Sequence, residues 1–169
     1  MSVATNGDDR VLVTAEGYEE RCRELERLRT DERRRLSGLL HEARSDGGAD
    51  DNPALIELLD EQALLERRIA VVETQVAVAE VAPLPSDGRA AVGSVVCVRD
   101  ASTSEVFEYQ LVGTIEGDPA SGRLSIAAPV GGALLGRQRG ERVEVATPRG
   151  GVTLEVLRVE APVPTSEAA

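Results

Sequence analysis

The stretch that decides the fold is residues 53–80, PALIELLDEQALLERRIAVVETQVAVAE. Along it, residues on one helical face recur with 3-4-3-4-3-4-3 spacing, and only one of them is polar: Leu55, Leu58, Gln62, Leu65, Ile69, Val72, Val76 and Ala79. This spacing is the heptad pattern of a coiled-coil seam. Asn52 and Pro53 favour a helix start, because Asn is a good N-cap and proline lacks only an N–H that has no helical partner there. The stretch therefore predicts one long helix with an apolar stripe.

A second series with 4-3 spacing lies upstream, less apolar but in register with the first. Its members are Tyr18, Cys22, Leu25, Arg29, Glu32, Leu36, Leu39 and Ala43. Thr14 stands just before the series as a candidate N-cap, so this helix is expected to begin near Ala15. A helix of about 30 residues would be roughly 45 Å long, too long to serve as packing for one small domain. We interpret this region as a probe or a lever.

The turn between the two helices is predicted at residues 45–52, where Gly47 and Gly48 favour a helix end. Antiparallel pairing about this turn sets Ala43 against Leu55, Leu36 against Gln62, Leu25 against Val72, and Tyr18 against Ala79. Residues 11–81 are thus predicted to form a coiled-coil hairpin. Its first residues, which include Val11 and Val13, are candidates for a hydrophobic staple or for a short strand.

The helical period ends after residue 81, where a proline-bearing linker is predicted over residues 82–88. Beyond it, residues 89–160 are expected to form one globular domain. Five short β-rich runs are separated there by glycine and proline turns, at residues 94–99, 105–112, 123–126, 142–146 and 152–159. One helical turn is predicted at residues 131–135. The pattern indicates a small twisted antiparallel sheet, with flexible tails at residues 1–10 and 161–169.

The formal net charge of −11 argues against general nucleic-acid binding, because that binding needs basic surface facing phosphate. A local basic patch remains at Arg33, Arg34 and Arg35. It is either a solvated helix face balanced by neighbouring carboxylates such as Glu66, or a stripe that contacts RNA. No apolar run is long enough for a membrane span and no signal peptide opens the chain, so a cytoplasmic protein with no membrane partner is expected. The two cysteines, Cys22 and Cys97, fall in different predicted domains and are expected to stay reduced.

The chain shows no sequence pattern typical of autonomous catalysis. It contains no nucleophile and base pair, no P-loop and no dinucleotide fingerprint. His41 has no cysteine or second histidine nearby, so it is interpreted as a solvated helix residue rather than a metal ligand. The protein is therefore not expected to be an enzyme with catalytic residues of its own.

Residues 11–160 resemble the bacterial GreA and GreB transcript cleavage factors. The motifs that carry the resemblance are Thr14-Ala15-Glu16-Gly17-Tyr18, Glu42-Ala43-Arg44, Gly47, Asn52, Gly88-Arg89, Ala128-Pro129-Val130-Gly131-Gly132-Ala133-Leu134-Leu135-Gly136-Arg137 and Thr147-Pro148-Arg149-Gly150-Gly151. The resemblance implies an α+β fold, an N-terminal antiparallel coiled-coil hairpin joined to a C-terminal FKBP-like β-sheet domain. It also implies that a monomer binds RNA polymerase, with the globular domain on the rim of the secondary channel and the hairpin inside it.

The family carries two carboxylates at the hairpin tip, in a Gly-Asp-x-x-Glu-Asn pattern, which help to hold a second Mg²⁺ in the polymerase active centre. The resemblance places the tip of this chain near that centre, through Asp46, Gly48, Asp50, Asp51 and Asn52. Gly48 stands where the first carboxylate belongs, and Asp51 where the family has glutamate. Asp51, with Asp50 or Asp46, is therefore the candidate ligand of a Mg²⁺ shared with the polymerase. No tightly bound cofactor is expected.

Two further sets of site residues are predicted, the first from the local charge and the second from the resemblance. A basic patch near the nascent RNA 3′ end, which it would contact indirectly, comprises Arg33, Arg34, Arg35 and Arg44. The polymerase-docking residues are Pro129, Gly131, Leu134, Leu135, Gly136 and Arg137, some of which could instead belong to the core.

The expected function is regulation of transcription elongation, by modulation or inhibition with weak or no transcript cleavage. A working GreA-like cleavage factor is the first alternative. A coiled-coil scaffold with no polymerase role is the second. Prolyl isomerase activity is disfavoured, because the chain has no tryptophan and few aromatic side chains for the required pocket.

Overall fold

The structure is a computed structural model that describes residues 10–45, 52–83, 87–148 and 150–161. Most of the two predicted tails, and the tip carboxylates, lie outside the described residues. The chain divides into two compact units, one formed by residues 19–78 and the other by residues 1–18 and 79–169. Among the described helices, none is both long enough and apolar enough to cross a membrane.

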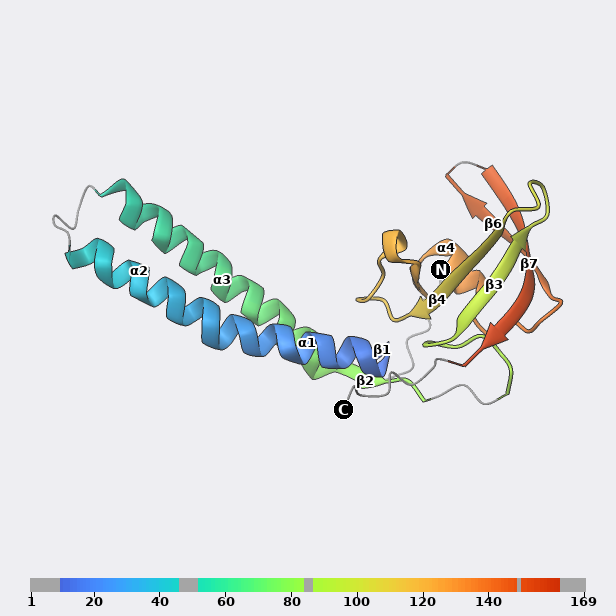
Figure 1. Cartoon of the computed structure of the whole chain (residues 1–169), viewed down its shortest axis with the longest axis horizontal. Coiled ribbons are helices and arrows are strands. Elements are labelled where there is room, and N and C mark those ends of the chain that lie inside the picture. The colour runs from blue at the N-terminus through green and yellow to red at the C-terminus, as the bar shows by residue number, and fades with distance from the viewer. Residues whose placement is uncertain (1–9, 46–51, 84–86, 149, 162–169) are drawn as a thin grey trace. The chain divides into compact units, whose positions relative to one another are not determined.

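The first unit is a helical hairpin (Figure 1). Its first arm is formed by α1 (Ala15–Arg27), which enters this unit at Glu19, a wide π-helical turn η1 (Leu28–Glu32) and α2 (Arg33–Ser45). Its second arm is α3 (Pro53–Val78). Both arms begin at the predicted caps: the Gly17 N–H donates to Thr14 Oγ1 at 2.9 Å, and the Ala54 N–H donates to Asn52 Oδ1 at 3.1 Å. These bonds satisfy N–H groups that have no partner inside the helix.

The seam of α3 follows the predicted series at its apolar positions as far as Val76. Leu55, Ile69 and Val72 are buried, and each packs in a cluster with residues of the first arm. One cluster is Leu28, Ile69 and Val72 with Leu25, Leu65 and Val76; the other is Leu36, Leu40 and Leu55 with Ala43, Leu58 and Leu65. The expected apposition of Leu25 with Val72, and of Ala43 with Leu55, agrees with these clusters.

The seam of the first arm differs from the predicted series at two positions. Leu28 is buried in place of Arg29, and Leu40 is more deeply buried than Leu39. Arg29 is exposed and binds Glu73 across the hairpin. The π-helical turn explains the change, because its wider turn adds a residue and moves the apolar stripe out of the strict heptad phase.

The base of the hairpin is a two-stranded parallel ladder. β1 (Val11–Val13) pairs with β2 (Ala79–Val81), with Val11 opposite Ala79. This settles the alternative left open for Val11 and Val13 in favour of a strand. It also corrects the expected pairing of Tyr18 with Ala79, because Ala79 has already left the helix for the ladder.

The second unit contains a five-stranded sheet in the order β5-β4-β3-β7-β6. Its strands are β3 (Val95–Asp100), β4 (Val106–Val112), β5 (Arg123–Ser125), β6 (Arg142–Thr147) and β7 (Gly150–Glu160). The expectation of a wholly antiparallel sheet is wrong at one edge, where β5 runs parallel to β4. The connection through residues 113–122, which includes the short helix η2 (Pro119–Ser121), returns the chain before β5 begins.

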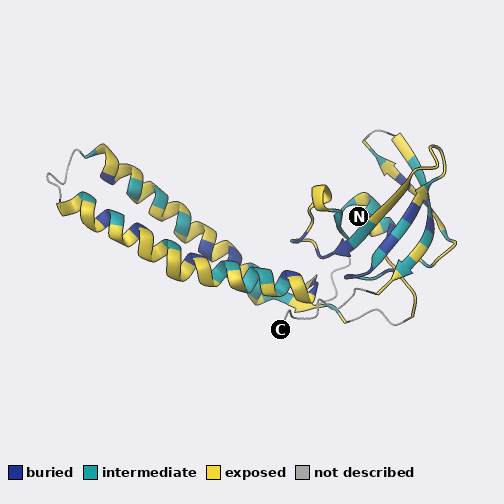
Figure 2. Cartoon of the chain, viewed as in Figure 1, coloured by how far each residue is buried: buried dark blue, intermediate teal, exposed yellow. Residues whose placement is uncertain are grey.

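The core of this unit lies where α4 (Pro129–Leu134) packs with the sheet (Figure 2). Its buried members are Ala90, Val96, Val98, Leu111, Leu134, Val143, Val145, Leu154 and Val156. Alternate residues of β3 and β6 are buried, as expected of strands with one apolar face. The predicted α+β class, a helical hairpin followed by a β-sheet domain, is confirmed.

Candidate functional site on the helical hairpin

The predicted tip is represented in the described residues by Asn52 alone, since Asp46, Gly48, Asp50 and Asp51 lie outside them. Besides capping α3 through Oδ1, Asn52 donates from Nδ2 to the Ala43 carbonyl oxygen at 3.4 Å. One side chain therefore joins the end of α2 to the start of α3. This second bond was not predictable from the capping pattern, because it depends on the distance between the two arms.

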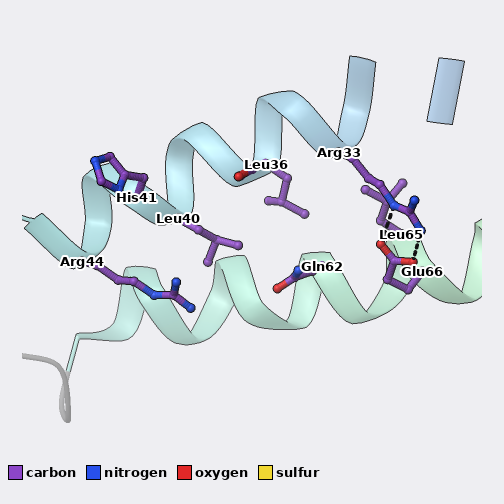
Figure 3. A pocket seen from close by; sticks show the side chains of 9 residues that line it. Arg33, Leu36, Leu40, His41, Arg44, Gln62, Leu65 and Glu66 are labelled. Atoms are coloured by element: carbon purple, nitrogen blue, oxygen red, sulfur yellow. Dashed lines mark hydrogen bonds and ion pairs between the residues drawn. The ribbon is translucent and has the colours of Figure 1, made fainter. Parts of the chain in front are cut away.

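A groove with a volume of about 550 Å³ lies between α2 and α3 (Figure 3). Its lining residues are Arg33, Leu36, Ser37, Leu40, His41, Arg44, Gln62, Leu65 and Glu66. Leu36 and Gln62, the pair expected to face each other, both line it. Gln62 is exposed although it occupies a seam position. A polar side chain that stays in solvent does not fill the seam, which explains why the groove opens at this point.

Two of the four predicted RNA-contacting arginines are engaged in ion pairs across the hairpin. Arg33 donates to Glu66 from Nε at 2.8 Å and from Nη2 at 2.5 Å. Arg35 binds Glu61 and also donates to Glu32 at 3.2 Å. The hydrogen bond from Arg33 lowers the pKa of Glu66, and the same bond raises the pKa of Arg33. These contacts favour the solvated, charge-balanced interpretation for both arginines.

The other two predicted arginines have no ion-pair partner among the described residues. Arg34 is exposed on α2, whereas Arg44 is the lining residue nearest the tip in sequence. Figure 3 shows the Arg44 side chain reaching from α2 toward α3, with the Arg33–Glu66 pair at the opposite end of the groove. His41, which also lines the groove, is exposed. The part of the groove nearest the tip thus carries cationic charge that the described residues do not neutralise.

Two further ion pairs connect the arms of the hairpin among the described residues. Arg29 binds Glu73 at 2.5 Å, and Arg68 binds Glu24 at 2.5 Å. Flanking pairs of this kind set the partner register of two helices more than they stabilise them, because exposed ion pairs contribute little. The Arg33–Glu66 pair belongs to the same set of ion pairs across the hairpin.

No group of three metal-ligating side chains occurs in the part of the chain that the structure describes. The predicted Mg²⁺ ligands, Asp51 with Asp50 or Asp46, fall outside that part.

The predicted docking residues separate into buried and exposed groups. Leu134 is 0% exposed in the sheet core, and Gly131 is buried against β5, where an added Cβ would lie 2.1 Å from the Ser125 carbonyl oxygen. Both residues serve packing, which favours the alternative that part of the predicted docking set belongs to the core. The residues that remain at the surface are Pro129, Leu135, Gly136 and Arg137. Leu135 is a large apolar side chain that is 41% exposed.

Comparison with known proteins identifies the family. The model described as "Transcription elongation factor, N-terminal" matches residues 11–81, and the model described as "Transcription elongation factor, GreA/GreB, C-term" matches residues 85–161. The chain belongs to the GreA/GreB family of transcription elongation factors. The GreA of Syntrophobacter fumaroxidans is 40% identical over 153 residues, which cover 89% of this chain and 97% of that relative. The GreA of Caulobacter sp. strain K31 is 37% identical over 154 residues, 90% of this chain and 98% of that relative.

Among solved structures, GreA factor homolog 1 of Thermus thermophilus matches with 29% identity and a TM-score of 0.40, over 89% of this chain and 99% of that one.

The present GreA/GreB family member also contains a polar residue that sequence reasoning missed. Glu116 is buried in the connection between β4 and β5. The signal that could have indicated it is Gly17, a glycine inside the first turn of a helix, where close approach of another group is the common reason for glycine.

Proposed function

We propose that this elongation factor binds RNA polymerase, inserts its hairpin into the secondary channel, and slows or modulates elongation while supporting transcript cleavage weakly or not at all. Family membership supports the polymerase as partner. The length of the hairpin supports insertion, because α3 has 26 residues and at about 1.5 Å per residue is roughly 39 Å long. The observation that carries the proposal is the tip sequence, in which Gly48 replaces one family carboxylate and Asp51 is one methylene shorter than the other.

The chemistry explains why the tip decides between the two outcomes. In two-metal phosphodiester hydrolysis, one Mg²⁺ activates the attacking water and the other stabilises the leaving oxygen. Mg²⁺ commonly takes one or two protein carboxylates and several waters. Asp51, with Asp50 or Asp46, would be the contribution of this chain. A tip with a single matched carboxylate provides a poorer ligand set than the family pattern.

The groove supplies the proposed contact with the nascent RNA end. Arg33 and Arg35 are already bound to glutamates, so Arg44 is the better candidate for a phosphate contact, with Arg34 on the neighbouring surface. A guanidinium without a carboxylate partner keeps its donors available for phosphate oxygens.

The second candidate function is stimulation of the polymerase's own RNA cleavage. Its support is the 40% identity to a relative named GreA over most of both chains. A scaffold role without the polymerase has no comparable support.

The test is transcript cleavage and elongation on a purified backtracked elongation complex, with and without the full-length protein. We expect slowed elongation and little shortened RNA from the wild type. Gly48→Asp combined with Asp51→Glu should create or raise cleavage. Asp51→Asn should abolish whatever stimulated cleavage exists, because it removes the charge at the metal, while Asp60→Asn, the same change on the exposed face of α3, should leave it intact.

Three outcomes would contradict the proposal in different ways. Efficient cleavage by the wild type that is lost in Asp51→Asn would favour the GreA-like alternative. Efficient cleavage that survives Asp51→Asn would overturn the metal assignment. Failure of the wild type to retain core RNA polymerase in a pull-down would overturn the partner itself.

A further inference from the structure

Glu116 is a buried carboxylate that accepts hydrogen bonds from its near neighbour Gly113 and from Thr14, 102 residues away along the chain. Its side chain is 1% exposed. Oε2 accepts from the Thr14 N–H at 3.0 Å and from the Gly113 N–H at 2.8 Å, while Oε1 accepts from the Thr14 hydroxyl at 2.5 Å. Arg123 Nη2 lies 3.5 Å from Oε1. An ionised carboxylate is costly to bury unless hydrogen bonds and a cation compensate, and this one has both.

The donors connect Glu116 to the first turn of α1. Thr14 is the N-cap of that helix, because its hydroxyl oxygen accepts from the Gly17 N–H, and the same hydroxyl donates to Glu116. The carboxylate also lies at the positive end of the helix dipole, where negative charge is favourable. Thr14 directly follows β1 and precedes α1, so the Glu116 side chain binds the chain at the point where the strand ends and the helix begins.

Two glycines make room for the carboxylate. A Cβ at Gly17 would lie 1.7 Å from Glu116 Oε1, and its three nearest neighbours all belong to the Glu116 side chain. A Cβ at Gly113 would lie 2.7 Å from Oε2 as well as 2.0 Å from the Leu12 carbonyl oxygen. Glycine inside a helix is about 1 kcal/mol less favourable than alanine. The close approach of Glu116 explains why glycine nevertheless occupies position 17.

We propose that Glu116 is a positioning residue. It holds β1 and the first turn of α1 on the β-sheet unit, so that the helix which continues into the hairpin starts from a fixed base. The inference rests on the proposed function, in which the hairpin must be presented to the channel while the sheet unit binds the polymerase. An apolar side chain could fill the same space, but it would leave the Thr14 and Gly113 amides without acceptors and would not fix the direction of the Thr14 contacts.

The structural part of the proposal is tested without the polymerase. Glu116→Gln keeps the shape but sets an NH₂ group against donors, and we expect amide hydrogen exchange at Thr14 and Gly113 to accelerate about tenfold or more, the effect of losing a hydrogen bond to a charged acceptor. Glu144→Gln, the same change at an exposed position of β6, should leave both amides protected. Unchanged protection of Thr14 and Gly113 in Glu116→Gln would overturn the assignment.

A double-mutant cycle provides a second structural readout. Gly17→Ala should lower the melting temperature, whereas Gly38→Ala, a helical glycine with no atom within 4 Å of an added Cβ, should not. In a Glu116→Ala background the penalty of Gly17→Ala should vanish, because the three atoms nearest the added Cβ have been removed. Additive effects of the two substitutions would contradict the contact.

The functional part compares binding with action. Glu116→Gln should keep its affinity for core RNA polymerase within about threefold, yet lose most of the wild-type effect on elongation at saturating concentration, because the hairpin is no longer presented from a fixed base. Glu144→Gln should match the wild type in both measurements. A full effect at saturation in Glu116→Gln would refute the positioning role. A wild type without binding or effect would instead refute the proposed function, with the exchange experiment still deciding the contact.

Discussion

Replacement of Ile69 by alanine tests the hairpin seam most directly. Ile69 is 2% exposed and packs with Leu28 and Val72. Truncation of a buried isoleucine to alanine costs about 2–5 kcal/mol through lost transfer energy and the cavity that remains. The seam is a single layer of side chains between two helices, which can partly close, so we expect the lower half of that range. For a unit of this size, even 2 kcal/mol corresponds to a melting temperature lower by about 8 °C or more.

Ile56 on the same helix is the matched control. It is 57% exposed, so Ile56→Ala removes little buried surface and gains slightly in helix propensity. Its free energy of unfolding should therefore stay within about 0.5 kcal/mol of the wild type. Far-ultraviolet circular dichroism of the full chain during thermal and urea unfolding reports on the helices. Equal losses in the two variants, or an unchanged transition in Ile69→Ala, would show that the seam is misassigned.

Two further predictions concern the sheet unit and the groove. Leu134→Ala should destabilise the sheet unit by about 2–5 kcal/mol, because Leu134 is buried in its core. Leu135→Ala should leave the stability of the unit unchanged and weaken polymerase binding, because Leu135 is exposed. The reverse pattern in unfolding and pull-down measurements would contradict the division of the docking residues. The pKa of Glu66 is lowered by its hydrogen bond from Arg33, so its stabilising contribution is present above the pKa of the unfolded carboxyl and is lost as the pH falls through the folded pKa. Nuclear magnetic resonance titration should show that lowered pKa and its return to the ordinary value in Arg33→Ala, and an identical midpoint in both proteins would rule out the pair in solution.

Local signals in the sequence predicted the elements that local physics determines. The start of α3 at Pro53 and the cap at Thr14 follow from which side chains can satisfy unpaired N–H groups. The apolar period of α3 predicted Ile69 and Val72 as seam residues, since a regular helix keeps its phase. Arg29 was predicted in the seam because the heptad was extended through a turn that is π-helical, and a wider turn leaves no periodic signal over five residues.

The features that sequence could not supply depend on contacts between distant segments. The parallel pairing of β5 with β4 is a property of the returning connection, because a strand three residues long carries no directional signal. Thr14, one of the hydrogen-bond partners of Glu116, is 102 residues away from it along the chain. The groove was predictable only in part. The antiparallel register brings Arg33 toward Glu66, so their ion pair could be inferred from the sequence. The direction of the Arg44 side chain, which reaches toward α3, could not.

Both arms of the hairpin begin at a cap that also binds another segment. Thr14 caps α1 and donates to Glu116, and Asn52 caps α3 and donates to the Ala43 carbonyl oxygen. A cap that only satisfied its own helix would leave the helix free to start at a neighbouring residue, because helix ends fray and shift at small cost. The second bond removes that freedom, since moving the start by one residue would break a contact outside the helix. One helical residue gained or lost at a start changes the phase between the helix and the segment before it by about a quarter turn. The second bond of each cap therefore keeps the arm in register with a neighbouring segment, which suits a factor proposed to act through the end of a long hairpin.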